Sequence, residues 1–418
     1  MIVLSGAALV LPDRLLSSGT LVIEDGRITE IRPEAAAPHG PSSFAFHGHY
    51  IVPGFIDVHV HGVDGADSQD PGDPIAFIAG RLPKYGVTAF CPTTVACPPG
   101  MLRQTLDQVR RARETPGGRS ARVLPAHLES NFINPEYRGA QPSGCLRSPA
   151  SLNGPPYAGR AGLSGPRPST EARTAKVEED FDGADILAEV ERAAPDVGIV
   201  TVAPELAGGL DLIRWLADRG HYVSLGHSAA TYDEALAGVA AGARQATHLF
   251  NRMPPLHHRA PGLAGAVLQA DDVAAEIICD GVHVHPALVR AAIAAKRPSR
   301  VMAITDATAA AGLPVGGRAS IGGHSITAAE STALLDDGTI AGSVTTMDRV
   351  FQFLVAAAGL SLVDAATLCA TTPARELGLV GHGVVAVDAA ADLVVLDANF
   401  AVVQTYVGGQ LAYSRTDD

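Results

Sequence analysis

Short apolar runs alternate with longer amphipathic stretches through the middle of the chain. Eight runs rich in Val, Ile, Leu and Ala have the length of β-strands, at 51–60, 87–93, 121–129, 197–205, 222–227, 245–250, 274–279 and 300–305. Helix-like stretches lie between most of them, for example at 75–85, 101–114, 183–194, 209–219, 231–241 and 285–296. Eight strands that alternate with helices predict an α/β fold, a (β/α)8 TIM-like barrel. A doubly wound open sheet is the weaker alternative, because no Gly-x-Gly-x-x-Gly follows the first strand.

Both ends of the chain have a different pattern, in which short strands are separated by turns. Residues 21–31 predict a hairpin with Asp25 and Gly26 at its turn, and 402–411 predict a second hairpin. We therefore expect a small β-sandwich domain built from both termini. The expected division is 1–52 for the N-terminal part of this sandwich, 53–380 for the catalytic barrel and 381–418 for its C-terminal part.

One segment of the barrel region breaks the alternation. Residues 142–170 are crowded with Pro, Gly, Ser and Arg and show no periodicity. A long loop at the catalytic end of a barrel often covers the site. We expect a mobile, lid-like loop here.

Composition narrows the class of protein. Hydrophobic residues make up 47% of the 418 residues, which is enough for a full core, and the net charge of −13 argues against nucleic acid as a partner. Five widely spaced cysteines form no Cys-x-x-Cys pair, which favours reduced thiols in a cytoplasmic protein. No apolar stretch reaches the length of a membrane span.

Histidines and acidic residues close several of the predicted strands. A barrel of parallel strands brings side chains at these positions to one rim. Imidazoles and carboxylates gathered there have the ligand chemistry of a hydrolytic divalent metal site. The six candidates are His59, His61, Glu129, His227, His248 and Asp306.

Each candidate also has a simpler interpretation when it is taken alone. His59 and His61 share one face of a strand, but a lone His-x-His pair is a weak signal. Glu129 can bind one metal, bridge two, or form a salt bridge to a helix. Asp306 can exchange a proton with the substrate or cap the following segment. If the simpler interpretations were right, all six residues would have reached strand ends independently and by accident. Their common position therefore favours metal-dependent hydrolysis.

Polar residues beyond two successive strands indicate the kind of substrate. Asn251 and Arg252 follow His248, Arg259 follows two further histidines, and His283 stands in the next such loop. Singly, each is more often a solvated loop residue. Clustered beyond adjacent strands, they can neutralise a phosphate, and arginine offers paired donors for it.

The motifs as a set resemble those of the amidohydrolase superfamily, and within it those of the N-acetylglucosamine-6-phosphate deacetylase family. The likeness runs in family order over nearly the whole chain. The segments that carry it are Pro-Gly-Phe-Ile-Asp-Val-His-Val-His-Gly (53–62), His-Leu-Glu (127–129), Gly-His-Ser-Ala-Ala-Thr (226–231), Thr-His-Leu-Phe-Asn-Arg-Met-Pro-Pro-Leu-His-His-Arg-Ala-Pro-Gly (247–262), Cys-Asp-Gly-Val-His-Val-His-Pro (279–286) and Thr-Asp-Ala-Thr-Ala-Ala-Ala-Gly-Leu-Pro (305–314).

The resemblance implies a metal-bearing barrel, usually as a homodimer. It implies Glu129, His227 and His248 as ligands of the main metal, with His59 and His61 matching the pair that holds a second ion where two are bound. One or two divalent ions are therefore expected, with zinc ahead of iron.

The resemblance also implies roles around the substrate. Asp306 matches the catalytic acid and base, and we expect it to take a proton from the attacking water and return it to the leaving amine. Asn251, Arg259 and His283 match positions that hold the sugar phosphate, and in the family the arginine reaches into the neighbouring subunit's site. The implied activity is hydrolysis of the N-acetyl amide of N-acetylglucosamine-6-phosphate.

The sequence departs from the family pattern at positions that we expect beside the substrate. Ser130 and Asn131 replace a Gly-Pro pair, Gln141 replaces a histidine that contacts the substrate near the scissile amide, and the loop at 142–170 is longer. A deacetylase for another N-acylated sugar or amino compound is thus an alternative. A cyclic-amide hydrolase or deaminase on the same barrel is disfavoured, because no lysine ends an early strand of the barrel, where it could act as a carbamylated bridge between two metals. A non-catalytic scaffold without metals is the remaining alternative.

Overall fold

The computed structural model describes residues 1–33, 42–149 and 181–416, and its centre is a nearly closed barrel of parallel strands. Neighbouring strands pair in parallel around the sheet, and a parallel bridge between Val60 and Ala307 links its last strand region to its first. The predicted barrel is confirmed. Its strands are β6 (Phe55–Val60), β9 (Val87–Thr94), β10 (Arg122–Val123), β11 (Ala126–Leu128), β12 (Val197–Val202), β13 (Tyr222–Leu225), β14 (Gln245–Ala246), β15 (Ala274–Ile278) and β16 (Val301–Ile304).

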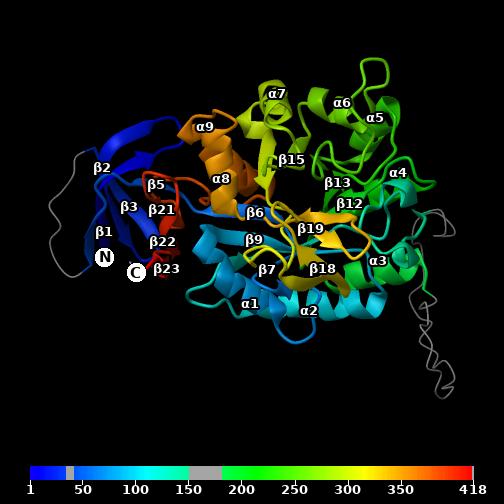
Figure 1. Ribbon diagram of the computed structural model, residues 1–418, viewed down its shortest axis with the longest axis horizontal. Coiled ribbons are helices and arrows are strands. Elements are labelled where there is room, and N and C mark those ends of the chain that lie inside the picture. Colours follow the sequence, from blue (N-terminus) through cyan, green and yellow to red (C-terminus); the bar gives the residue numbers. More distant parts are fainter. Residues whose placement is uncertain (34–41, 150–180, 417–418) are drawn as a thin grey trace.

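Helices lie around the outside of the barrel (Figure 1). They bury one apolar face each, as in α4, where Leu212, Ile213 and Leu216 are buried. The helix α6 was not predicted, because its residues from Gly262 to Val267 are all buried and give no amphipathic pattern. The helices are α1 (Pro74–Arg81), α2 (Pro99–Glu114), α3 (Gly183–Arg192), α4 (Gly209–Asp218), α5 (Tyr232–Ala241), α6 (Gly262–Gln269), α7 (Pro286–Lys296), α8 (Met347–Ala356), α9 (Leu362–Ala366) and α10 (Thr372–Glu376).

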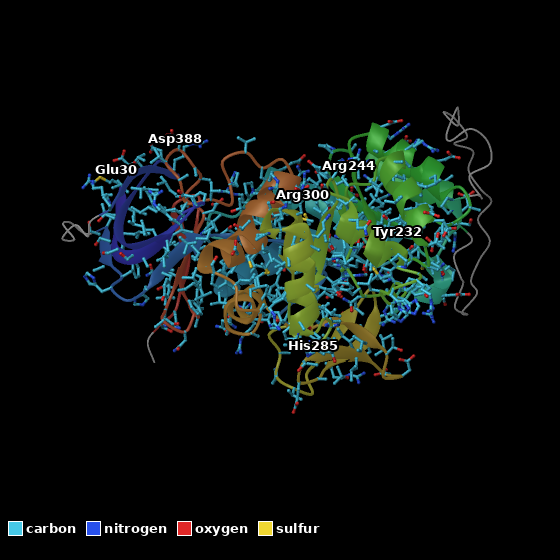
Figure 2. The ribbon with its side chains drawn as sticks, turned by 90° about the horizontal axis from the view of Figure 1, so that it is seen from above. Glu30, Tyr232, Arg244, His285, Arg300 and Asp388 are labelled. Atoms are coloured by element: carbon cyan, nitrogen blue, oxygen red, sulfur yellow. The ribbon has the colours of Figure 1, made fainter. Side chains whose placement is uncertain are left out.

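Strands from the two ends of the chain form a separate sheet beside the barrel, coloured blue and red in Figure 1. The sheet is continuous, in the order β23-β22-β21-β5-β1-β2-β3, with β4 against β1. Figure 2 shows Glu30 and Asp388 in this part of the molecule, and Tyr232 on the helices that surround the barrel. The strands are β1 (Ile2–Val10), β2 (Leu15–Glu24), β3 (Arg27–Arg32), β4 (Ser43–Ala45), β5 (Tyr50–Pro53), β21 (Leu393–Leu396), β22 (Val402–Val407) and β23 (Gln410–Ser414).

The predicted single strand at 51–60 is wrong, because the structure divides it into β5 and β6 at Gly54. β5 pairs with β21 of the terminal sheet, whereas β6 pairs with β9 of the barrel. A Cβ on Gly54 would collide with the Thr88 side chain, so glycine allows the close packing at this crossing. An apolar run cannot by itself reveal that its two halves pair in different sheets.

A four-stranded antiparallel sheet follows β16 and was not predicted. It consists of β17 (Arg318–Ile321), β18 (His324–Ala328), β19 (Thr332–Leu335) and β20 (Ile340–Ser343), and a short pair, β7 (Gly62–Val63) and β8 (Ala66–Asp67), lies near the end of β6. The four-stranded sheet has a small core of its own, which includes Val95 just after β9.

The loop expected to form a lid, 142–170, is only partly covered by the structure. Residues 150–170 lie outside the described residues, and 143–145 form one 3-10 turn. Within the described residues, no helix is long and apolar enough to span a membrane.

Candidate active site

A cavity of about 480 Å³ opens where the barrel strands end. Residues that follow β11, β13, β14 and β16 line one side of it, and the hairpin of β19 and β20 contributes Ile340, Ala341 and Gly342 to the other. The cavity thus has a polar floor and a partly apolar wall. The sequence-predicted residues that line it are His61, Glu129, Gln141, His227, His248, Asn251, Arg252, His283 and Asp306.

Glu129, His227 and His248 converge on one point although they come from three different strand ends. The Nε2 atoms of His227 and His248 lie 2.7 and 2.8 Å from Oε1 of Glu129, and 3.0 Å from each other. All three side chains are buried. The geometry brings together the residues that were expected to hold the main metal.

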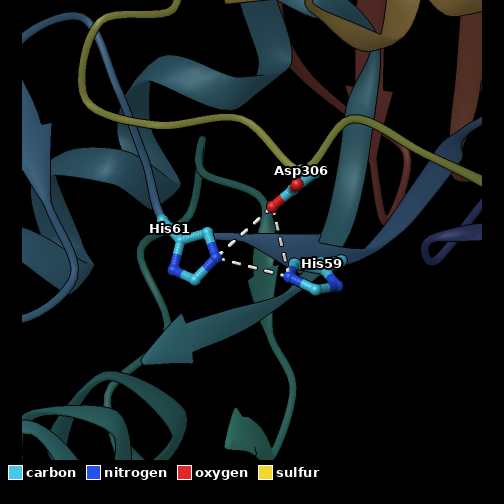
Figure 3. Close-up of side chains that lie close together, drawn as sticks. All are labelled: His59, His61 and Asp306. Carbon is cyan, nitrogen blue, oxygen red and sulfur yellow. Dashed lines mark hydrogen bonds and ion pairs between the residues drawn. The ribbon is translucent and has the colours of Figure 1, made fainter. Parts of the chain in front are cut away.

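His59, His61 and Asp306 form a second group (Figure 3). It lies beside the first group. The two Nε2 atoms lie 3.3 Å apart, and they are 3.3 and 3.4 Å from Oδ1 of Asp306. Glu129 stands between the groups, with Oε1 at 3.7 Å from Nε2 of His59 and Oε2 at 3.5 Å from Nε2 of His61. The sequence prediction that six strand-end residues share one rim is confirmed.

The donor atoms of both groups fit a divalent cation. Ligands about 2.0–2.1 Å from a tetrahedral metal are separated by about 3.3 Å. The donor atoms of the second group are 3.3 to 3.4 Å apart, and those of the first group are closer together, at 2.7 to 3.0 Å. Each pair of facing ring nitrogens, at 3.3 Å in His59 and His61 and at 3.0 Å in His227 and His248, can share one proton at most, and a bound cation would take the place of that proton. Imidazole and carboxylate donors suit zinc, iron and related transition metals.

Hydrogen bonds on the far side of the imidazoles orient two of the rings. Nδ1 of His227 donates to the carbonyl of Tyr137 at 2.8 Å, and Nδ1 of His59 donates to Oε2 of Glu276 at 3.0 Å. Such bonds leave Nε2 as the free lone pair that a metal needs. Glu276 is fully buried, and sequence reasoning missed it, although a charged residue inside the apolar run of β15 was a usable signal.

His127 lies close to this network, but both of its ring nitrogens form hydrogen bonds inside the barrel. Its Nδ1 donates to the carbonyl of Val58 at 3.1 Å, and its Nε2 accepts from the Thr201 hydroxyl at 3.0 Å. With both ring nitrogens bonded, His127 serves the packing of the barrel.

The electrostatics of the site favour a bound cation. Burial lowers the pKa of His59 to about 4, so that ring is neutral and its lone pair is available at neutral pH. Burial opposes protonation of His248, but the hydrogen bond and charge of Glu129 raise its pKa to about 9. Burial raises the pKa of Asp306, yet the neighbouring His59 and His61 lower it further, below its ordinary value. The neutral ring of His59 and the ionised carboxylates of Glu129 and Asp306 are the forms of these groups that bind a cation.

The residues expected to hold the substrate lie on the outer wall of the cavity, with one exception. Asn251 Nδ2 and His283 Nε2 are buried and have no hydrogen-bond partner among the described residues. The other ring nitrogen of His283 bonds to Oδ2 of Asp280 at 2.6 Å. Arg252 also lines the cavity, whereas Arg259 is exposed and lies outside its lining.

The three unusual residues occupy different places. Gln141 is buried and lines the cavity, where it donates to Glu129. Ser130 and Asn131 lie behind the cavity wall rather than on it: Ser130 donates to the carbonyl of Thr201, and Asn131 donates to those of Cys97 and Cys145. Of the three residues expected beside the substrate, only Gln141 therefore lines the cavity.

Comparisons with known proteins agree with this geometry. The Amidohydrolase family model matches residues 50–412. N-acetylglucosamine-6-phosphate deacetylase of Bacillus subtilis is 33% identical over 97% of this chain and 96% of its own, and that of Homo sapiens is 34% identical over 96% and 90%. The structure of a variant deacetylase from Mycobacterium smegmatis in complex with N-acetyl-D-glucosamine-6-phosphate is 30% identical, covers 99% of both chains and has a TM-score of 0.83. The chain belongs to the amidohydrolase family and, within it, to the N-acetylglucosamine-6-phosphate deacetylase family.

Proposed function

We propose that the protein hydrolyses the N-acetyl amide of N-acetylglucosamine-6-phosphate to glucosamine-6-phosphate and acetate. The observation that carries the proposal is the double cluster of imidazoles and carboxylates at the floor of the cavity, which has the donor set of a hydrolytic metal site. The proposed substrate is the one that the relatives are named for. Asn251 and His283 each have a buried nitrogen without a hydrogen-bond partner among the described residues, and these nitrogens could donate to an anionic group of the substrate.

In this proposal Glu129, His227 and His248 hold the main divalent ion, and His59 and His61 hold a second one where it is bound. Zinc is the proposed metal, with iron as the alternative. When bound, the ion lowers the pKa of water to about 7 and polarises the carbonyl as a Lewis acid.

Asp306 is the proposed catalytic base and acid. Its carboxylate accepts a proton as the water oxygen bonds to the acetyl carbon, and it then delivers that proton to the nitrogen as the carbon–nitrogen bond breaks. The lowered pKa keeps Asp306 ionised and ready to accept the first proton at neutral pH. The buried walls around it hold the two reactants together and limit access of other water.

Asn251, Arg252 and His283 are the proposed phosphate-binding residues of the same chain. Arg259 is proposed to complete this subsite in the partner of a homodimer, which its exposure outside the cavity allows. The exposed apolar side chain of Leu256, three positions before Arg259, suits such an interface. The cytoplasm is the expected compartment, because a charged sugar phosphate does not cross membranes.

A hydrolysis screen tests the substrate. N-acetylated sugars with and without a 6-phosphate would be compared, together with N-acyl amino compounds, and bound metals would be quantified in the same samples. We expect the 6-phosphate of N-acetylglucosamine to give the highest kcat/KM. Preference for an unphosphorylated compound would favour the alternative deacetylase, and a protein without metal or activity would favour a scaffold.

The Asp306→Asn variant tests the mechanism. We expect kcat to fall by about 10²–10⁴-fold, because the amide cannot carry the proton between water and leaving group. Metal content should stay at the wild-type level, as measured by elemental analysis. Turnover near the wild-type rate with unchanged metal content would show that Asp306 does not have this role.

A further inference from the structure

The side chain of Gln141 is fixed at both ends of its amide. Its Oε1 accepts from the backbone N–H of Ala96 at 2.7 Å, and its Nε2 donates to Oε2 of Glu129. A backbone N–H can only donate, so it selects the amide oxygen and turns the NH₂ group toward Glu129. The orientation of this amide is therefore set by the backbone.

This contact gives the two oxygens of Glu129 different surroundings. Oε1 faces the Nε2 atoms of His227 and His248, whereas Oε2 receives the hydrogen bond from Gln141. A carboxylate free to rotate would exchange its oxygens between these positions. The bond from Gln141 opposes that rotation and keeps Oε1 directed at the two imidazoles.

The backbone that carries Gln141 is itself held in place. The Gln141 N–H donates to the carbonyl of Arg138 at 3.1 Å. Nearby, Asn131 donates to the carbonyls of Cys97 at 2.9 Å and Cys145 at 2.7 Å. Asn131 and Gln141 thus both attach the segment 129–147 to the backbone that follows β9.

We propose that Gln141 is a positioning residue that orients Glu129 for metal binding, and that it is not a direct ligand of the substrate. This inference rests on the proposed function, because it takes Glu129 as a metal ligand. Both polar atoms of the amide are already engaged within the protein, which leaves one N–H of Gln141 for any contact with the cavity. Residues that orient metal ligands in this way typically change metal affinity by about 10–100-fold when they are replaced.

The test uses Gln141→Met, which keeps the length of the side chain and removes both hydrogen bonds. Zinc dissociation constants of the full-length wild type and variant would be measured by competition with a chelator, and kcat and KM would be measured on zinc-loaded protein. We expect the dissociation constant to rise at least about tenfold. If Gln141→Met does not fold, Gln141→Asn serves instead, because its amide is too short to span both partners.

Asn131→Ala is the matched control. It releases the same segment from the same stretch of backbone, but it leaves the bond between Gln141 and Glu129 in place. We expect its zinc dissociation constant to stay within about threefold of wild type, well below the change predicted for Gln141→Met, while its thermal midpoint falls.

Three results would overturn the proposal. An unchanged zinc dissociation constant with a raised KM in Gln141→Met would identify Gln141 as a substrate ligand. Equal loss of zinc affinity in both variants would assign the effect to the segment as a whole. A wild-type protein that binds no divalent cation would overturn the proposed metal site as well, which separates that failure from the first two.

Discussion

Three of the six clustered imidazole and carboxylate residues, His227, His248 and Asp306, have left-handed backbone conformations, with φ of 46°, 30° and 49°. Such conformations are uncommon for residues other than glycine and cost on the order of 1–3 kcal/mol each. Neighbouring backbone holds Asp306 in this conformation: its N–H donates to the backbone carbonyl of His59 at 3.1 Å, and its carbonyl accepts from the N–H of Ser343 at 2.9 Å. These sharp turns after the strands direct the side chains into the cavity.

Glu276 gives a prediction at the same scale. Its carboxylate accepts from Nδ1 of His59 and is fully buried, and no lysine or arginine among the described residues is bonded to it. Replacing it by glutamine removes the charge and keeps the shape, so Glu276→Gln should weaken metal binding at His59 and His61 by about 10–100-fold. Elemental analysis of protein equilibrated in metal buffers would measure the bound ions.

Glu234→Gln is the matched control for this variant, because Glu234 is an exposed carboxylate that caps α5. It should bind as much metal as the wild type does. Equal metal stoichiometry in Glu276→Gln and the wild type at every metal concentration would contradict the role given to Glu276.

At the scale of elements, one buried carboxylate joins the barrel to the terminal sheet. Asp392, just before β21, binds Arg122 of β10 at 2.8 Å and His382 at 2.8 Å, and it accepts from the Gly408 N–H at 2.6 Å. The carboxylate thus connects segments that lie 270 positions apart in the sequence. Removing the carboxylate takes the acceptor away from three partly exposed donors, and each such hydrogen bond contributes about 0.5–1.5 kcal/mol.

The pKa of Asp392 makes this contact dependent on pH. Burial raises the pKa, but the bonds from His382 and Arg122 lower it further, below its ordinary value. A carboxyl whose pKa is lower in the folded protein than in the unfolded chain stabilises the fold. The stabilisation is complete at pH values above the pKa in the unfolded chain, about 3.9, and it is lost as the pH falls through the lower pKa of the folded protein. Asp392→Asn should therefore lower the urea midpoint at pH 7, and the difference from wild type should shrink below about pH 4.

Asp13→Asn, which removes an exposed ion pair with Arg14, should leave the urea midpoint almost unchanged. A deficit of Asp392→Asn that is as large at pH 3 as at pH 7 would show that the ionised carboxylate is not the source of the stability.

At the scale of the whole molecule, the site gathers buried groups from β6 and from the ends of β11, β13, β14 and β16, so a bound ion ties those strands together. Binding to the folded state alone stabilises it by about 2.7 kcal/mol when the free metal is at 100 times its dissociation constant. Removal of metal by a chelator should therefore lower the thermal midpoint, and added zinc should restore it. Scanning calorimetry of both forms would measure the shift.

The His227→Ala variant should show a smaller shift, because it lacks one of the three groups around the main position. Identical midpoints for metal-loaded and verified metal-free wild type would mean that the ion makes no contribution to the folded state.

The sequence by itself determined the barrel, the sheet from both termini and the six residues at the rim. Alternating polarity, position at a strand end and family motifs are local properties of the sequence. In a barrel of parallel strands, all carboxyl ends lie on the same rim, so residues at these ends come together whatever the other contacts are. These features could be predicted because each depends on residues close to one another along the chain.

Only the tertiary structure decided how those residues are supported. The split at Gly54, the sheet of β17–β20 beside the cavity, the role of Glu276 behind His59 and the bond from Gln141 to Glu129 all join segments distant in sequence or depend on a backbone turn. Hydrogen bonds act over about 3 Å, and the sequence does not record which atoms the folded chain brings to that distance.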